Sequence, residues 1–197
     1  MRGKASLQPI ATPYAVAQIA RSKNFTPGQR AAIELAATST DRVILIQGDA
    51  GTGKTYALNG LRELKSDWQL RGLAPSASAA VTLETKSGIP SQTLDSYLLS
   101  PNTPKGETLI LDEAGLMSSR QAVALLSKAQ QHECRVILIG DTKQLSSVEA
   151  SSPFRLLQQA GVQTAQLTEN RRQKEAELKA AIDLAPRGQI AESYERL

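Results

Sequence analysis

A glycine-rich run in the first third of the chain has the spacing of a phosphate-binding loop. Residues 48–55 fit the pattern G-x-x-x-x-G-K-[ST] and directly follow an apolar run at 43–46. The glycines of this pattern let successive N–H groups point into one concavity, the lysine reaches the β- and γ-phosphates, and the final hydroxyl ligates Mg²⁺. A glycine-rich turn without a ligand is disfavoured, because an apolar strand precedes the loop and a helical spacing follows it. The predicted nucleotide-binding residues are Gly48, Asp49, Ala50, Gly51, Thr52, Gly53, Lys54 and Thr55.

Two carboxylates follow a second apolar run, at 108–111. Asp112 and Glu113 stand at the carboxyl end of this expected strand. In an open parallel sheet that edge is where ligands bind, so the pair is expected to face the phosphate loop. Asp112 is then suited to hold Mg²⁺ opposite Thr55, and Glu113 to orient and deprotonate an attacking water. The alternative is a pair of solvated acids that cap the next helix.

Two later segments could report on a γ-phosphate. Gln144 follows the apolar run 136–139 in the segment Gly-Asp-Thr-Lys-Gln, where a neutral donor could bond the γ-phosphate and respond to its loss. A simple turn would also explain that segment. Further along, the guanidinium of Arg171 or Arg172 could stabilise charge on a transferring phosphoryl group, as an arginine finger does. Two arginines on a solvated helix start are the alternative, and these residues alone do not choose between Arg171 and Arg172.

The elements that must position these residues alternate along the chain. Short, continuous apolar runs separated by helical patterns predict right-handed crossovers and an α/β fold, with a parallel sheet covered by helices on both faces. The predicted strands are 43–46, 72–74, 108–111, 136–139 and 162–167, and the predicted helices are 54–66, 76–86, 93–99, 119–131 and 152–160. Residues 1–23 are expected to be an N-terminal linker or a short helix.

Composition limits the class of protein. A chain of 197 residues with 41% hydrophobic residues can bury the core of one ordinary domain. The single cysteine, Cys134, predicts a buried hydrophobe in a reducing compartment, because the single histidine, His132, is expected at a helix end rather than as a catalytic partner. No apolar stretch approaches the roughly 18 residues of a membrane span, so a cytoplasmic location without a membrane segment is expected. The net charge of +4 favours a polyanionic partner only mildly.

Seven segments in sequence order resemble the motifs of superfamily 1 helicases. They are 25–33, 48–55, 74–80, 92–98, 112–117, 140–145 and 168–173. The chain resembles the first motor domain of RecD-like, 5′-to-3′ DNA helicases, and especially the helicase region of conjugative relaxase-helicases of the TraI/TrwC type. The resemblance implies a RecA-like P-loop NTPase fold over residues 24–197, with ATP and Mg²⁺ as cofactors.

The resemblance also implies roles for individual residues. Gln29 would read the adenine edge, and Arg172 would be the arginine that meets the γ-phosphate. Ser76, Ser78 and Thr93 would contact the backbone of single-stranded DNA, on the opposite side of the sheet edge from much of the ATP site. Small hydroxyls suit that task because they hold phosphates without reading bases. The alternative for these hydroxyls is helix capping, at Ser76 and at Ser91 or Thr93.

The sequence departs from the helicase pattern in two ways. Gly115 stands where many relatives carry a serine after Asp-Glu-Ala, and the motifs of the second motor domain are absent from these 197 residues. We therefore expect a first lobe whose partner is the second motor domain of the same parent chain, and which unwinds nothing by itself. The alternative is a degenerate helicase-like module that grips single-stranded DNA with little ATPase activity. The intact loop, Asp112, Glu113 and Gln144 argue against degeneration, and a GTPase-type switch would require an Asn-Lys-x-Asp run that the sequence lacks.

Overall fold

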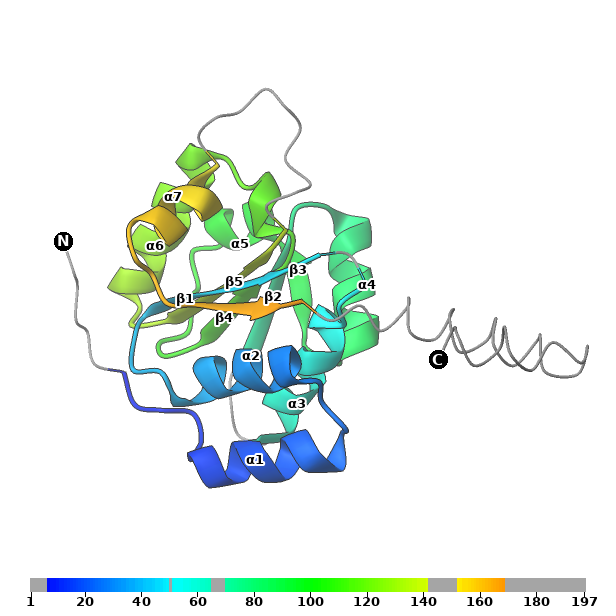
Figure 1. Ribbon diagram of the computed structural model, residues 1–197. Coiled ribbons are helices and arrows are strands. Elements are labelled where there is room, and N and C mark those ends of the chain that lie inside the picture. The colour runs from blue at the N-terminus through cyan, green and yellow to red at the C-terminus, as the bar shows by residue number, and fades with distance from the viewer. Residues whose placement is uncertain (1–6, 50, 65–69, 142–151, 169–197) are drawn as a thin grey trace, which may run out of the picture.

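The apolar runs form the strands of one parallel sheet in the computed structural model of the chain, which describes residues 7–49, 51–64, 70–141 and 152–168 (Figure 1). The elements of these residues are α1 (Pro13–Ser22), α2 (Pro27–Thr38), β1 (Val43–Gly48), α3 (Lys54–Leu64), β2 (Leu70–Ala74), α4 (Ala77–Ser87), β3 (Ser91–Thr93), α5 (Leu94–Leu99), β4 (Thr108–Leu111), the 3₁₀-helix η1 (Ala114–Leu116), α6 (Ser119–Gln131), β5 (Arg135–Gly140), α7 (Pro153–Gln159) and β6 (Thr164–Leu167). The strands lie in the order β3-β2-β4-β5-β1-β6, and each neighbouring pair is parallel. The predicted α/β class is confirmed.

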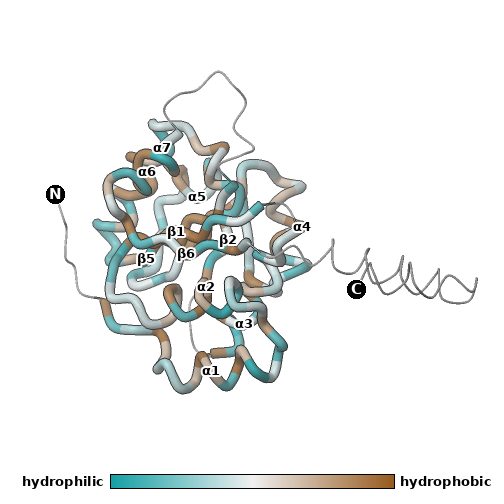
Figure 2. The backbone as a smooth tube through the Cα atoms, viewed as in Figure 1, coloured by the Kyte–Doolittle hydropathy of each residue, from teal (hydrophilic) through white to brown (hydrophobic). Residues whose placement is uncertain are grey.

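Alternate strand residues face two separate hydrophobic cores. In β1, Ile44 and Ile46 join the core shared with α1 to α4, whereas Leu45 joins the core shared with α5 to α7. Figure 1 shows α1, α2 and α3 on one face of the sheet and α5, α6 and α7 on the other. Because side chains alternate in direction along a strand, burial on both faces requires a continuous apolar run. The strands at the centre of the molecule accordingly include strongly hydrophobic segments (Figure 2), and none of the described helices is both long and apolar enough to cross a membrane.

Three of the described elements lie outside the predicted set, namely α2, β3 and the single turn η1. β3 is a polar strand of three half-buried residues that, among the described strands, pairs with β2 alone and so forms one edge of the sheet. An edge strand needs no continuous apolar run, so its sequence gives little signal. α2 begins with a capping box, in which the Thr26 hydroxyl accepts a hydrogen bond from the Gln29 backbone N–H and the Gln29 side chain accepts one from the Thr26 N–H. The run Thr-Pro-Gly-Gln carries that start signal in the sequence.

The N-terminal stretch packs onto the sheet domain. Residues 13–22 form α1, in which Val16 is 1% exposed and shares a core with α2 and α3. Ahead of it, Ile10 is buried and its N–H donates to the Ala37 carbonyl. The buried Arg135 guanidinium donates to the carbonyls of Gln8 and Ala36, which ties this stretch to the start of β5 and to the end of α2. Residues 7–22 therefore share the core of the domain that follows them.

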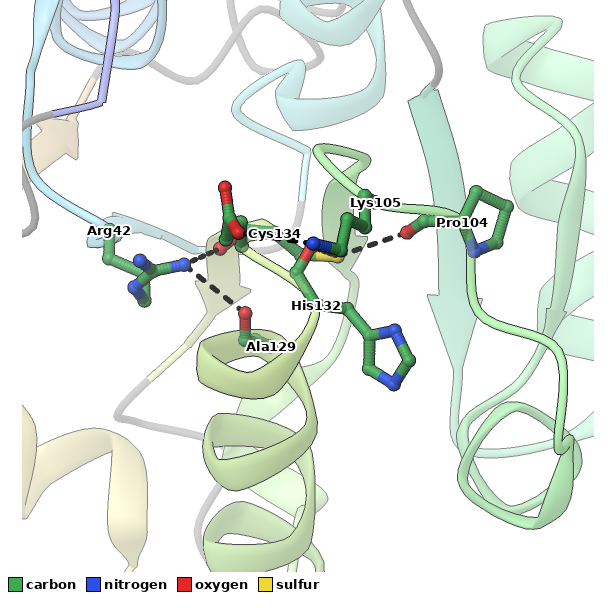
Figure 3. A network of polar contacts seen from close by, with 7 residues as sticks. Arg42, Pro104, Lys105, Ala129, His132 and Cys134 are labelled. Carbon is green, nitrogen blue, oxygen red and sulfur yellow. Dashed lines mark hydrogen bonds and ion pairs between the residues drawn. The ribbon is translucent and has the colours of Figure 1, made fainter.

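Cys134 is structural, as its sequence context predicts. It is fully buried, and its thiol lies near the carbonyl oxygens of Pro104 and His132 (Figure 3). Burial raises the pKa of the Cys134 thiol, which keeps it neutral and unreactive. His132 lies at the end of α6 with its ring directed away from the sulfur. Arg42 donates to the carbonyl of Ala129, in the last turn of α6, and to the carbonyl of Cys134, directly before β5. The Ala129 oxygen, which has no partner within the helix, also accepts from the Cys134 N–H.

We predict that α1 contributes to the stability of the whole domain. Val16→Ala removes two buried methyl groups and should lower the free energy of unfolding by about 1–3 kcal/mol. The matched control is Val123→Ala in α6, because Val123 is 67% exposed and the gain in helix propensity is similar at both positions. Urea unfolding of the two variants measures the difference. Equal stabilities would show that α1 does not pack as described.

Candidate nucleotide site

The predicted phosphate loop makes a tight turn between β1 and α3. Gly51 and Gly53 have φ angles of +88° and +79°, a region that favours glycine because it lacks a Cβ atom. Between them Thr52 is buried, and its hydroxyl donates to the Asp49 carbonyl at 2.9 Å. The chain therefore adopts the strand-loop-helix context that the motif requires. Ala50 lies outside the described residues.

Lys54 is the first residue of α3, and its amine hydrogen-bonds with carbonyls of the preceding loop. Its Nζ atom donates to the Gly48 carbonyl at 2.6 Å and to the Asp49 carbonyl at 3.1 Å. The first N–H groups of a helix have no partner inside the helix and carry a partial positive charge. The ammonium and the start of α3 thus place positive charge at the same end of the loop, which suits an anionic ligand such as a polyphosphate.

Gln29 reaches the loop from α2. It is 0% exposed, and its Nε2 atom donates to the Thr52 carbonyl at 3.1 Å. Its Oε1 atom accepts from the Thr26 backbone N–H at 3.2 Å. Contact between Gln29 and adenine remains a prediction, and the structure gives both ends of this amide partners within the protein.

The two predicted carboxylates follow β4 at the sheet edge where the phosphate loop also lies. Asp112 is half-buried, and its Oδ1 atom accepts from the Glu113 N–H at 2.9 Å. Burial raises the pKa of Asp112, and this rise is opposed by that hydrogen bond and by the positive charges of Lys54 and Lys86. The exposed Glu113 has left-handed backbone angles, φ 53° and ψ 37°, a strained conformation for a residue with a side chain that is often found at functional sites. Glu113 precedes η1 without a side-chain capping bond, so helix capping does not explain this acid.

One cavity is lined by the two predicted metal ligands, the predicted general base and the two predicted DNA-binding serines. It has a volume of about 420 Å³, and its polar lining comes from Thr55, Ser76, Ser78, Thr82, Lys86, Asp112 and Glu113. Ser76 and Ser78 thus lie beside Thr55 and the two carboxylates, and their contact with single-stranded DNA remains a prediction. β2 lies beside β4, so the start of α4, which follows β2, adjoins the carboxylates that follow β4. Thr82 and Lys86 were not predicted, although with Ser78 they repeat every four residues along one face of α4.

The predicted capping roles of Ser76 and Thr93 are confirmed. The Ser76 hydroxyl accepts from the Ala79 N–H at 3.2 Å, and the Thr93 hydroxyl accepts from the Ser96 N–H at 3.2 Å. A hydroxyl that accepts in this way still has a hydrogen to donate, so capping does not exclude contact with a DNA phosphate. Thr93 pairs with Ala74 at the end of the edge strand and does not line the cavity. Of the two alternatives for α5, Thr93 is the N-cap, whereas Ser91 lies in β3 and its hydroxyl donates to the Ile89 carbonyl.

Thr55 and Asp112 fit Mg²⁺ as ligands. A hydroxyl and a carboxylate supply the hard oxygen atoms that Mg²⁺ prefers, and Mg²⁺ at nucleotide sites takes one or two carboxylates together with substrate phosphates. Within the described residues no cluster of three histidine, cysteine or acidic side chains could hold a metal alone. A half-buried carboxylate whose pKa is raised by burial gains from a nearby cation. The residues present therefore suit a metal that arrives with a nucleotide.

Position 115 leaves little space for a side chain. A Cβ atom on Gly115 would lie 3.3 Å from the carbonyl oxygen of Asp141, directly after β5. A serine there would require that neighbour to give by a few tenths of an ångström. Gln144 and Arg172, which are also predicted to contact the γ-phosphate, lie outside the described residues, as does Arg171.

Comparison with known sequences places residues 24–197 in a family described as an AAA domain. The chain is 33% identical over 188 residues to the probable conjugal transfer protein TraA of Sinorhizobium fredii, a match that covers 90% of this chain and 17% of the relative. It is 30% identical to the multifunctional conjugation protein TraI of Escherichia coli K12, covering 69% of this chain and 8% of the relative. It is 32% identical to the ATP-dependent RecD2 DNA helicase of Deinococcus radiodurans, covering 67% and 20%. The chain thus spans a fifth or less of the length of these relatives.

Solved structures share the fold. Two Pif1 helicases at forked double-stranded DNA match with a TM-score of 0.57 and 21% identity, over 81% of this chain and 47% of that chain. A Bacteroides Pif1 bound to single-stranded DNA matches with a TM-score of 0.54 and 20% identity, over 86% and 48%. These likenesses confirm the predicted P-loop helicase-like fold, and the curated relatives confirm the predicted resemblance. The chain belongs to the AAA_30 family of AAA domains, and it is a helicase-like domain similar to parts of the TraA and TraI conjugation proteins and of RecD2.

Proposed function

We propose that the chain is the ATP-binding and ATP-hydrolysing first motor lobe of a 5′-to-3′ DNA helicase, within a plasmid conjugative relaxase-helicase that unwinds DNA during transfer. The observation that carries this proposal is that Thr55, which follows the loop lysine, lines the same cavity as Asp112 and Glu113. Relatives named as conjugal transfer proteins and as a DNA helicase support it. A Bacteroides Pif1 with the same fold was solved with ADP-AlF3 and single-stranded DNA.

The residues of the cavity suit the hydrolysis of a nucleoside triphosphate. Lys54 would neutralise charge on the β- and γ-phosphates, and Glu113 would accept a proton as a water oxygen attacks the γ-phosphorus. Thr55 and Asp112 would hold Mg²⁺, which would neutralise further phosphate charge when bound. Gln144 and Arg172 complete the proposed set at the γ-phosphate. The second motor domain of the parent chain would supply the other wall of the site.

Three hydroxyls near the carboxyl ends of β2 and β3 are suited to bind the backbone of single-stranded DNA. Ser76 and Ser78 begin α4 after β2, and Thr93 ends the neighbouring β3. Donors of this kind bind phosphates without reading bases, as a motor that moves along any sequence requires. Because both serines also line the cavity that contains Glu113, a bound strand would lie close to the hydrolytic residues.

We predict that Glu113→Gln lowers ATP hydrolysis stimulated by single-stranded DNA by about 10²- to 10⁴-fold, since it removes the proposed general base while keeping the side-chain shape. Nucleotide binding should persist, whereas Lys54→Ala should weaken it. Steady-state hydrolysis and binding of a fluorescent ATP analogue, both measured in the parent protein that contains this domain, separate the two effects.

Glu133→Gln and Lys105→Ala are the matched controls for these variants. Glu133 is also an exposed glutamate with a positive φ, of 56°, and it pairs with Lys105 on the surface, outside the cavity. Normal hydrolysis by Lys54→Ala or Glu113→Gln would rule out the proposed chemistry. A parent protein that binds single-stranded DNA but neither binds nor hydrolyses ATP would instead be the degenerate DNA-binding module.

We also predict that Ser78→Ala weakens the affinity for single-stranded DNA about three- to thirtyfold, through the loss of one hydrogen bond to a charged phosphate. Ser78 lies inside the first turn of α4 and is not its N-cap, so alanine keeps the helix. Ser119→Ala, in the first turn of α6, is the matched control. Fluorescence anisotropy with several DNA homopolymers should show that the variant loses a similar share of its affinity for each base. The affinity itself should decline steeply as the salt concentration rises. A loss restricted to one base would contradict the proposed phosphate contact.

A further inference from the structure

A second and larger cavity lies at the amino ends of the strands, opposite to the candidate nucleotide site. Its volume is about 890 Å³. The first residues of β2, residues 88–90 before β3 and Glu107 directly before β4 contribute to its lining, together with the last turns of α3 and α4. We call it the amino-end cavity. The proposed hydrolysis of ATP assigns no role to the residues that line this cavity alone.

Lys86 connects the amino-end cavity to the cavity of the nucleotide site. It is the residue that lines both of them. Ser78, Thr82 and Lys86 follow one another at intervals of four residues in α4, so they share one face of that helix. The eight residues from Ser78 to Lys86 span about 12 Å along the helix axis. A continuous polar track therefore runs along α4, from the serines at its start to the amino-end cavity at its end.

The amino-end cavity has an excess of positive charge. Three basic residues and two carboxylates line it, and both carboxylates are already paired. Glu107 accepts from Arg71 at 3.1 Å, and Glu63 pairs at 2.8 Å with the lysine that follows α1, which lies outside the cavity. Within the described part of the chain, Arg62 and Lys86 form no ion pair. Two cations thus line the cavity without a carboxylate partner.

The structure restrains both arginines of the amino-end cavity. Glu107 is 2% exposed and holds the Arg71 guanidinium from below the surface. The Arg62 guanidinium lies against Gly88, where an added Cβ atom would overlap its Nη1 atom. Gly88 caps the carboxyl end of α4, and the partial negative charge of a helix carboxyl end favours a cation there. Restrained guanidinium groups lose less freedom when they bind a ligand.

The donors along this track suit the phosphodiester backbone of DNA. Hydroxyl, ammonium and guanidinium groups bind phosphate oxygens, and a guanidinium can donate two parallel hydrogen bonds to one phosphate. Neither cavity has an aromatic side chain among its described lining residues, so neither offers a surface on which bases could stack. The track is several times longer than the rise of about 3.4 Å per phosphate in one strand of duplex DNA. A strand bound at Ser78 can therefore place further phosphates beside Lys86 and Arg62.

We propose that the amino-end cavity is a second phosphate-binding site for the same DNA strand, in which Lys86 and Arg62 bind the backbone beyond Ser78. This inference rests on the proposed binding of single-stranded DNA at Ser78. It lengthens the bound part of the strand without adding a preference for any base.

Thymidine oligomers of increasing length test the proposal. The quantity measured is the oligomer concentration that gives half-maximal stimulation of ATP hydrolysis by the parent protein, so that DNA bound elsewhere on the parent is not counted. The shortest stimulating oligomers should act equally on wild type and Arg62→Ala, because they end before the amino-end cavity. Longer oligomers should bind Arg62→Ala about three- to tenfold more weakly, since one contact to a charged phosphate is lost.

The salt dependence gives a second readout with the long oligomers. The slope of log affinity against log salt should be shallower by about 0.7 in Arg62→Ala, the change for one phosphate contact to a single strand. Arg62→Lys keeps the positive charge and should keep the slope. Arg21→Ala is the matched control, because Arg21 is also an exposed arginine in the last turn of its helix and lies outside both cavities. It should change neither the slope nor the length dependence.

Unchanged affinity of Arg62→Ala for the long oligomers would overturn the proposal, as would an equal loss for oligomers of every length. An equal loss of affinity for a fluorescent ATP analogue would assign Arg62 to the nucleotide phosphates and would also overturn it. If Arg62→Ala does not fold, Arg62→Gln retains most of the side chain and carries the same test. A response to Ser78→Ala but not to Arg62→Ala rejects this inference alone, whereas a wild-type protein that no oligomer stimulates rejects the proposed function as well.

Discussion

A parallel sheet that is covered by helices on both faces can offer polar groups to a ligand only at the ends of its strands. This constraint determines where the whole site lies. Because β1, β2 and β4 run in one direction, the loop after Gly48, the carboxylates after Leu111 and the serines after Ala74 leave the sheet at the same edge. The strand faces are occupied by two hydrophobic cores and leave no room for a ligand. Groups far apart in the sequence therefore converge on one cavity.

The phosphate loop needs support from outside itself. Gly51 and Gly53 allow its curl, but glycine also gives the loop the most conformational freedom to lose on folding. The structure restrains the loop from behind through Gln29, which binds the Thr52 carbonyl, and from within through Thr52, which binds the Asp49 carbonyl. Glycine thus permits the geometry, and buried hydrogen bonds select it.

Charge in the cavity is arranged for an anionic ligand and its metal. The half-buried Asp112 has a raised pKa because of burial, while the positive charges of Lys54 and Lys86 oppose that rise. Both cations come from helices on the same face of the sheet, one beginning at the phosphate loop and one following β2. A carboxylate between two cations stays compatible with a bound metal and with the negative charge of a polyphosphate.

The sequence by itself determined what depends on neighbouring residues: the apolar strands, the spacing of the phosphate loop, the acids after β4 and the hydroxyl caps of α4 and α5. Burial on both faces leaves a local apolar run, and a loop that binds phosphate needs glycine, lysine and a hydroxyl at fixed separations. Only the tertiary structure placed Ser78 and Lys86 beside Glu113, turned the amide of Gln29 onto the loop and added the polar edge strand β3. These features depend on which strands are neighbours and on how helices pack over them. The strand order β3-β2-β4-β5-β1-β6 is a property of the packed molecule, which no local run of residues encodes.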